Sequence, residues 1–330
     1  MEINIRWGIL STANIALESV IPAMLNSEYC SVISIASRNI KKAKKIAKKF
    51  QIPKYFGSYQ ELLDDKEIEA VYIPLPNHLH VKWAEKALQA GKHVLLEKPV
   101  ALSSEEAKKL QAEAKKHPTL KIMEAFMYRF HPQWIRVKEM VDAGEIGQLK
   151  TIQSSFSFFD NNPDSIVNQK EYGGGSLMDI GCYPISISRF LFGEEPKNVS
   201  ANIEYHSEFK VDVLATAILE FNQGTSSFFS SIQMLDNQQV QIFGTEGNIT
   251  FEIPFNPPAD QEVKIWLTKE NVKKEIEFAI CDQYKLQADI FSLAIMEHKN
   301  VPVDLDDAIN NMIVIEKLEE SNRIGKRVSL

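Results

Sequence analysis

The first 124 residues alternate short apolar segments with helical segments, and this alternation is the feature that most constrains the fold. The expected strands are residues 3–10, 32–36, 70–74, 94–97 and 120–123. Helices are predicted between them at 41–50 and 81–90, and a third follows the capping-box spacing of Ser103 and Glu106. Strands that alternate with helices form parallel sheets. Residues 1–124 are therefore predicted to form an α/β domain with a doubly wound parallel sheet.

The chain changes character near residue 124, where β-rich segments begin to follow one another directly. These segments are 150–159, 211–221, 225–234 and 240–243. Helices are expected beside them at 132–143, 176–192, 283–298 and 306–323. Successive strands usually pair as antiparallel neighbours. Residues 125–330 are therefore predicted to form an α+β domain with a large open, mainly antiparallel sheet.

Charge and hydropathy exclude two classes of partner. The net charge is −7, and the lysines and arginines are spread along the chain. A nucleic acid needs a concentrated basic surface, so none is expected as a partner. No apolar stretch approaches the ~20 residues that span a bilayer, so no membrane partner is expected either. The first residues alternate like a strand rather than a signal peptide, which predicts a cytoplasmic protein.

The spacing of cysteine and histidine indicates neither disulfides nor a metal site. Cys30, Cys182 and Cys281 are far apart and outside any C-x-x-C pattern, as expected for reduced, structural thiols. His78 and His80 are two residues apart, so their side chains diverge at a helix start, and no carboxylate cluster accompanies them. We therefore predict no metal.

A turn of small residues follows the first strand, where a dinucleotide-binding fold carries its glycine-rich motif. It comprises Ser11, Thr12, Ala13, Asn14 and Ile15, so both leading glycines are replaced. Small side chains still allow a pyrophosphate to approach the N–H groups of a helix N-terminus. The turn predicts cofactor binding, and an ordinary strand-to-helix turn is the alternative.

The second strand ends in Ser37 and Arg38, where a site for NAD would place a carboxylate on the ribose hydroxyls. A hydroxyl and a guanidinium suit a 2′-phosphate instead, since arginine donates paired hydrogen bonds to phosphate oxygens. The pattern favours NADP over NAD, unless Arg38 has only a surface role at the strand end.

A lysine is predicted at the carboxyl edge of the parallel sheet, where ligands bind in this architecture. The apolar strand at 94–96 runs into Glu97, Lys98 and Pro99. Pro99 restricts the backbone of Lys98, and a cis bond between them would aim the lysine inward. Lys98 could then polarise a carbonyl, although most lysines at strand ends are simply solvated.

The second domain carries a candidate acid–base pair on its helix at 176–192. Three glycines at 173–175 precede this helix, and Asp179 and Tyr183 are four residues apart, which places them on one face if the helix has begun by then. A tyrosine near a lysine ammonium can exchange a proton with a substrate hydroxyl. The alternative is a packed Tyr183 and an Asp179 that caps the helix.

Several stretches together resemble the Gfo/Idh/MocA oxidoreductases, and they span nearly the whole chain. They are residues 6–10, 76–80, 90–99 with the Glu-Lys-Pro motif, 123–132 and 179–183. Within the family, Tyr183 makes the chain look closest to dimeric trans-dihydrodiol dehydrogenases and NADP-dependent D-xylose 1-dehydrogenases. The resemblance implies a Rossmann first domain and a hydride transfer between a nicotinamide and an aldose or diol.

The resemblance also implies roles for individual residues. Lys98 would be the catalytic lysine, Tyr183 the general acid and base, and Asp179 the residue that orients substrate or Tyr183. Pro74, Asn77, His80 and Glu97 would lie on the cofactor side, and Phe126, Arg129 and His131 in the substrate cleft. A homodimer or larger homo-oligomer would form through the open sheet. A non-catalytic regulator that binds cofactor and sugar, or a dehydrogenase of an inositol or modified sugar, is the alternative.

Overall fold

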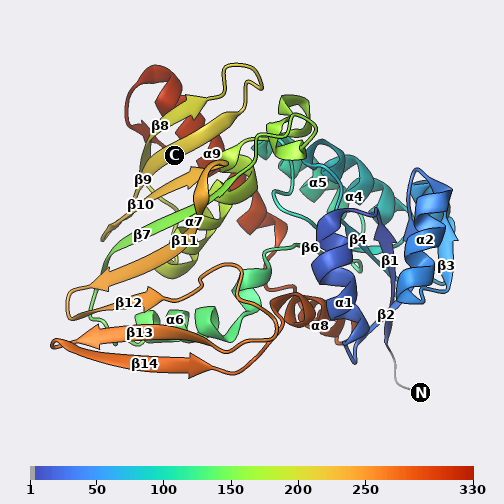
Figure 1. The fold of residues 1–330 in the computed structure, drawn as a ribbon, viewed down its shortest axis with the longest axis horizontal. Helices are drawn as coiled ribbons and strands as arrows, with labels where there is room; N and C mark the ends of the chain where they lie inside the picture. The colour runs from blue at the N-terminus through green and yellow to red at the C-terminus, as the bar shows by residue number, and fades with distance from the viewer. Residues whose placement is uncertain (1–3) are drawn as a thin grey trace. The chain divides into compact units, whose positions relative to one another are not determined.

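A six-stranded parallel sheet organises the first part of the chain in the computed structural model, which describes residues 4–330 (Figure 1). The strand order is β3-β2-β1-β4-β5-β6. The strands are β1 Ile5–Leu10, β2 Cys30–Ala36, β3 Lys54–Phe56, β4 Ala70–Ile73, β5 His93–Leu96 and β6 Ile122–Glu124. The order reverses beside β1, so the carboxyl ends of β1 and β4 flank the switch point at which such sheets bind ligands. This confirms the predicted Rossmann architecture.

Helices join these strands, and several begin where a short polar side chain caps the first turn. Asn39, Ser58 and Ser103 each accept hydrogen bonds from main-chain N–H groups two or three residues ahead. The helices are η1 Ala16–Val20 with α1 Ile21–Leu25, α2 Ile40–Phe50, α3 Tyr59–Asp64, η2 Asn77–Leu79, α4 His80–Gln89 and α5 Ser104–Ala114. Local capping chemistry therefore fixes these starts, in agreement with the predicted helices.

The predicted strands differ from the observed ones mainly at their ends. β3 was not expected, because it has only three residues and none of them is fully buried. Residue 3, the start of the predicted first strand, lies outside the described residues.

A segment far along the chain belongs with this sheet. The compact units are residues 1–127 with 282–309, and residues 128–281 with 310–330. Helix α8, Gln283–Met296, places Ser292 where its hydroxyl accepts a hydrogen bond of 3.2 Å from Nε1 of the buried Trp7. Phe291 packs on the same ring, at 5.7 Å between centroids. The observed units therefore differ from the predicted division at 124/125, which left 282–309 with the second domain.

The second unit is built on a nine-stranded sheet of order β14-β13-β12-β11-β7-β10-β9-β8-β15. β10 and β7 are parallel, and the remaining pairs are antiparallel. The strands are β7 Leu149–Phe159, β8 Asn198–Tyr205, β9 Asp212–Glu220, β10 Thr225–Ser231, β11 Gln233–Gly244, β12 Gly247–Phe251, β13 Val263–Lys269, β14 Val272–Phe278 and β15 Val328–Ser329. The predicted open, mainly antiparallel sheet is confirmed.

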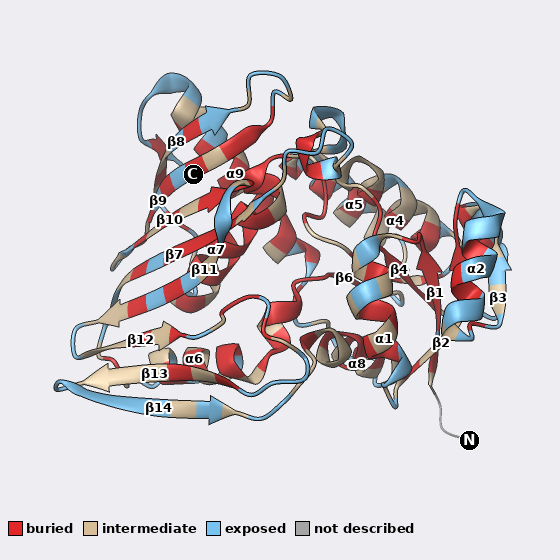
Figure 2. Ribbon diagram, viewed as in Figure 1, coloured by how far each residue is buried: buried red, intermediate tan, exposed pale blue. Residues whose placement is uncertain are grey.

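Helices of the second unit include α6 Pro132–Asp142, α7 Cys182–Phe192 and most of α9, Leu305–Ile324. Short helical turns precede α6 and α7: η3 Met127–Phe130, η4 Ile166–Asn168, η5 Lys170–Tyr172 and the π-helix η6 Leu177–Gly181. Burial is greatest along the central strands of the first sheet and along α7, where only Phe190 and Phe192 are not fully buried (Figure 2). Within residues 4–330, no helix combines the length and the apolar character needed to cross a bilayer.

Candidate active site

The turn that carries Lys98 is held by three protein groups at the carboxyl end of β5. The Lys98–Pro99 peptide bond is cis. The Glu97 carboxylate accepts the N–H of Lys98 at 3.3 Å, and the buried Glu124 carboxylate accepts the N–H of Val100 at 2.7 Å. The third group is the imidazole of His80, 2.8 Å from the carbonyl oxygen of Pro99. The main chain on both sides of the half-buried Lys98 is therefore fixed.

His80 contributes to this turn from a fully buried position at the start of α4. Its Nδ1 lies near the Pro99 carbonyl, and its Nε2 lies 2.6 Å from the carbonyl oxygen of Leu75. Burial lowers the pKa of His80 to about 4, so the ring is neutral at physiological pH. The structure thus places His80 between two loops at the carboxyl edge, and its predicted place on the cofactor side stays a prediction. Of its predicted neighbours, Pro74 is buried and Asn77 half-buried in the loop after β4.

Two tyrosines that the sequence analysis missed lie near Glu97. The Tyr72 hydroxyl donates a hydrogen bond of 2.5 Å to Glu97 Oε1. Tyr284 of α8 hydrogen-bonds Ser19, and burial, followed by the nearby Glu97 charge, raises the pKa of Tyr284 to about 12. Tyr284 therefore remains a neutral hydrogen-bonding group. The sequence gave no signal that Tyr284 lies near Glu97, because the predicted division places α8 in the second domain.

The turn after β1 adopts a glycine-like conformation in spite of its missing glycines. Ser11 takes φ 147°, a conformation that favours glycine, and its hydroxyl accepts the N–H of Ala13 at 3.0 Å. Helical geometry begins at Asn14, and Leu17 N–H bonds to the Ala13 carbonyl at 3.1 Å. Thr12 is buried, whereas Ala13 and Ile15 are half-buried and Asn14 is exposed. A helix therefore begins directly after β1, and the N–H groups at such a helix start stabilise an anion.

Arg38 lies two residues after the end of β2, beside Tyr59. Its guanidinium hydrogen-bonds Tyr59, whose ring packs edge-on against Trp83 at 5.1 Å. Burial raises the pKa of Tyr59, and the positive charge of Arg38 partly opposes this shift. The buried Ser37 hydroxyl accepts the N–H of Asn39 at 3.2 Å. Arg38 itself is exposed, so its positive charge is available to a ligand.

In the second unit, Asp179 and Tyr183 lie on one continuous helical segment. Helical geometry begins at Ser176, so the condition for placing both side chains on one face is met. Asp179 lies within the π-helix η6, and such π-turns are frequent at functional sites. Asp179 is half-buried and Tyr183 is 5% exposed.

An aromatic cluster fixes the ring of Tyr183. The rings of Tyr128, Phe156 and Phe255 lie 5.9, 5.6 and 5.4 Å from it, between centroids. The Tyr128 hydroxyl is itself 2.7 Å from Ser186 Oγ of α7. Because the ring is packed on several sides, the position of the Tyr183 hydroxyl depends on where the helix backbone lies.

The three residues expected in the substrate cleft have packing or capping contacts. Phe126 is fully buried, and the Arg129 guanidinium lies 4.1 Å from the centroid of the Phe190 ring. His131 caps α6, because its Nδ1 accepts the N–H of Gln133 at 3.2 Å. Burial lowers the pKa of His131 to about 4, consistent with this acceptor role. Direct substrate contact by any of them stays a prediction.

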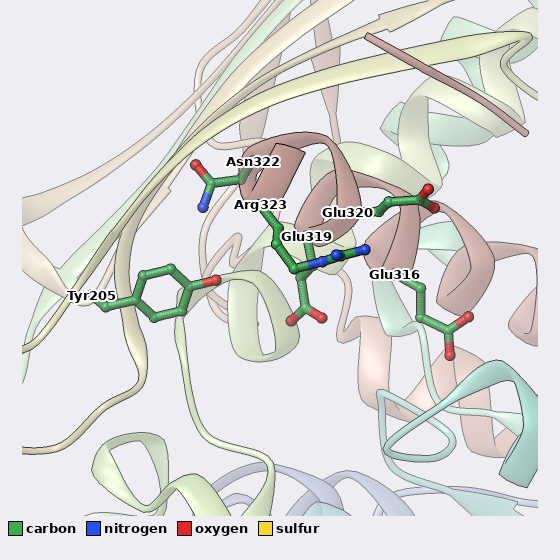
Figure 3. A pocket seen from close by; sticks show the side chains of 6 residues that line it. All are labelled: Tyr205, Glu316, Glu319, Glu320, Asn322 and Arg323. Atoms are coloured by element: carbon green, nitrogen blue, oxygen red, sulfur yellow. The ribbon is translucent and has the colours of Figure 1, made fainter. Parts of the chain in front are cut away.

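The second unit also contains a separate polar cavity of about 460 Å³ between β8 and α9 (Figure 3). Its lining residues are Tyr205, Glu316, Glu319, Glu320, Asn322 and Arg323. Figure 3 shows Tyr205 reaching from β8 toward the α9 side chains. None of the sequence-predicted site residues lines this cavity. Across residues 4–330, no cluster of three or more histidine, cysteine or acidic side chains is arranged to hold a metal ion.

A parallel sheet of order 321456, a helix that begins directly after its first strand and a lysine turn held at its carboxyl edge define a class of protein: a dinucleotide-binding α/β protein with an appended sheet domain. The comparisons give the family. The oxidoreductase family model with the NAD-binding Rossmann fold, GFO_IDH_MocA, matches residues 5–125, and the GFO/IDH/MocA C-terminal domain matches residues 134–250. The chain belongs to this oxidoreductase family.

Similar proteins match along their whole lengths. An oxidoreductase of Rhizobium meliloti, ORF334, is 42% identical over 97% of this chain and 98% of its own. D-xylose 1-dehydrogenase (NADP(+)) 2 of Haloferax volcanii is 36% identical over 98% and 99%. The 3-ketoreductase KijD10 of Actinomadura kijaniata, solved with NADP and TDP-benzene, has a TM-score of 0.90 at 28% identity, covering 96% and 98%.

Proposed function

We propose that this oxidoreductase uses NADP(H), in preference to NAD(H), to interconvert a hydroxyl and a carbonyl group on an aldose or a trans-dihydrodiol. The observation that carries the proposal is the fixed Lys98 turn at the carboxyl edge of the parallel sheet. The NADP-dependent sugar dehydrogenase and ketoreductase among the similar proteins support the substrate class. In this proposal residues 1–124 bind the cofactor, and residues 125–330 hold the substrate and form the oligomer.

The residues at the switch point fit a dinucleotide. Ser11 to Ile15 would hold the pyrophosphate on the N-terminal N–H groups of the first helix. Ser37 and Arg38 would hold the 2′-phosphate of the adenosine ribose, since the guanidinium is exposed and positioned by Tyr59. The nicotinamide, when bound, supplies the carbon that accepts or gives the hydride.

Three side chains would carry the proton and the charge. Tyr183, as the phenolate, takes the proton of the substrate hydroxyl during oxidation, and the resulting neutral phenol returns it during reduction. Lys98 stabilises the negative charge that develops on the same oxygen, because its ammonium is held by a rigid main chain. Asp179, four residues before Tyr183, orients the substrate or the tyrosine.

The test is an activity panel with a matched lysine control. Purified protein is mixed with NADP+ and with aldoses, trans-diols and inositols, and the absorbance of the reduced nicotinamide is followed. We expect turnover of an aldose or a trans-diol, lost in Lys98→Ala and kept in Lys108→Ala, which changes an exposed lysine of α5. Binding of NADP+ without turnover of any compound would contradict the catalytic proposal and favour a regulator.

We further propose a cytoplasmic homodimer or larger homo-oligomer. The sheet of the second unit carries exposed apolar side chains, including Ile218 on β9, Phe159 on β7 and Leu235 on β11, the last 87% exposed. Apolar side chains exposed on a sheet favour association. Cys30, Cys182 and Cys281 are far apart in the sequence and outside any C-x-x-C pattern, which suits a reducing compartment. Light scattering that gives the mass of a single chain would contradict the oligomer.

A further inference from the structure

A buried carboxylate on β9 contacts the first turn of the helical segment that carries Asp179 and Tyr183. Asp212 Oδ2 accepts a hydrogen bond of 2.7 Å from the Ser176 hydroxyl and another of 2.7 Å from the main-chain N–H of Leu177. Asp212 is 6% exposed. We propose that Asp212 is a positioning residue for Tyr183 and Asp179, an inference that rests on the proposed function of these two residues.

This segment lacks a cap of its own. Its first residue, Ser176, makes no side-chain capping bond to the helix N–H groups, and its hydroxyl is turned toward the sheet. The first N–H groups of a helix need an acceptor when they are buried, and a negative charge there interacts favourably with the helix dipole. Asp212 supplies both from a strand 35 residues along the chain.

The contact is close on both sides. Gly175 has φ +116°, and a Cβ at this position would overlap Asp212 Oδ1, so the glycine permits the approach of the carboxylate. The Ser176 hydroxyl also lies 3.1 Å from Ser230 Oγ on β10. A Cβ on Gly181 would come within 2.9 Å of the same Ser230 hydroxyl. The segment is therefore fixed against β9 at its start and against β10 one turn later.

Fixing the start of this segment fixes Tyr183. The Tyr183 ring is packed against Tyr128, Phe156 and Phe255, so a shift of the helix along its axis would force the ring out of this cluster. Burial raises the pKa of Asp212, and the hydrogen bonds from Leu177 and Ser176 oppose this shift. Burying a carboxylate at this contact therefore costs free energy. A neutral side chain would be less costly if the anchor served stability alone.

The experiment compares Asp212→Asn, which keeps the shape and removes the charge, with Asp289→Asn. Asp289 is a matched control, because it is also 6% exposed and hydrogen-bonded, to Ser27 and Lys285, but it lies in the first unit near the amino end of β2. Fluorotyrosine placed at position 183 alone reports the environment of that ring. Hydrogen exchange of the peptide 176–183 reports the helix start. Both readouts work without any substrate.

We expect Asp212→Asn to shift the fluorine resonance of residue 183 and to increase exchange in 176–183, while Asp289→Asn changes neither. With D-xylose or another substrate found by the panel, kcat should fall about 10- to 100-fold, with KM and the Kd for NADP+ within about twofold of wild type. Ser176→Ala removes one of the two donors to Asp212 and should change both readouts in the same direction as Asp212→Asn, but by a smaller amount. If Asp212→Asn does not fold, Ser176→Ala provides the test in its place.

Equal effects of the two aspartate variants on exchange and on the fluorine resonance would overturn the proposal, as would an unchanged kcat. If wild type turns over no substrate, the proposed function fails. In that case the resonance and the exchange of Asp212→Asn still decide whether Asp212 positions residue 183.

Discussion

The Nδ1 atom of His80 lies 2.8 Å from the carbonyl oxygen of Pro99, so a fully buried imidazole at the start of α4 holds the residue that follows Lys98. The same ring reaches the Leu75 carbonyl through Nε2. The imidazole therefore lies between two loops at the carboxyl edge of the sheet and, being neutral, donates to one of their carbonyl oxygens, so the position of Lys98 depends on a residue that does not bear its charge.

Replacing His80 with leucine should impair Lys98 indirectly. The neutral ring has one N–H, so one buried carbonyl oxygen would lose its donor, which costs about 1–3 kcal/mol of unfolding free energy. We expect kcat to fall about 10-fold or more because Lys98 is displaced, with a smaller change in NADP+ affinity. Steady-state kinetics and urea unfolding measure both. His117→Leu, at a half-buried surface position, is the control, and a loss of stability without any loss of kcat would contradict the link to Lys98.

Tyr183→Phe removes the proposed proton-transferring hydroxyl and keeps the aromatic packing. We expect kcat to fall about 10²- to 10⁴-fold, the usual range for the loss of a general acid or base, with little change in melting temperature. Tyr205→Phe on β8 provides a control for the loss of a tyrosine hydroxyl elsewhere in the second unit. A kcat for Tyr183→Phe within a few-fold of wild type would assign the proton transfer to another group.

Arg38→Asp should reverse the cofactor preference. The substitution replaces a phosphate ligand by a carboxylate that can accept the ribose hydroxyls and repels a 2′-phosphate. We expect the ratio of NADP+ to NAD+ affinity to fall about 10- to 100-fold, measured by fluorescence titration. Lys48→Asp, at the far end of α2, makes the same change in net charge. An unchanged ratio in Arg38→Asp would refute the role of Arg38.

Ser11 should tolerate glycine better than alanine. Its φ of 147° is unfavourable for any residue with a Cβ, and its hydroxyl also accepts the Ala13 N–H. Ser11→Gly and Ser11→Ala both lose this hydrogen bond. Only glycine relieves the backbone strain, which is ~1–3 kcal/mol. The conformational entropy of glycine in the unfolded chain reduces this gain. We expect Ser11→Gly to exceed Ser11→Ala by about 1 kcal/mol in unfolding free energy. The opposite order in thermal or urea unfolding would show that this backbone is unstrained.

His131 should make the protein less stable in mild acid. Burial lowers its pKa to about 4 from an ordinary 6.5, so the unfolded chain binds the proton first as the pH falls. The contribution of neutral His131 to the free energy of unfolding is therefore complete above pH 6.5. It is lost as the pH falls toward 4, by up to about 1.4 kcal/mol per pH unit. His131→Asn keeps a capping acceptor but does not titrate. Urea midpoints at about pH 7 and about pH 5 should differ less in this variant than in wild type or in the surface variant His298→Asn.

The amino-acid sequence by itself determined the features that depend on near neighbours. The strand and helix alternation and the capping by Asn39 and Ser103 follow from residues within a few positions of one another. The family motifs are also local, so the order of residues along the chain is enough to single out Lys98, Asp179 and Tyr183.

Only the tertiary structure decided which distant segment completes each of these features. Ser292 accepts the Trp7 N–H from 285 positions away and Asp212 caps Leu177 from 35, and His80 and Glu124 together hold the loop after Lys98. A buried donor requires an acceptor, but its local sequence does not say which strand or helix supplies it. Packing makes that choice, because the partner must be brought there by the fold of the whole unit.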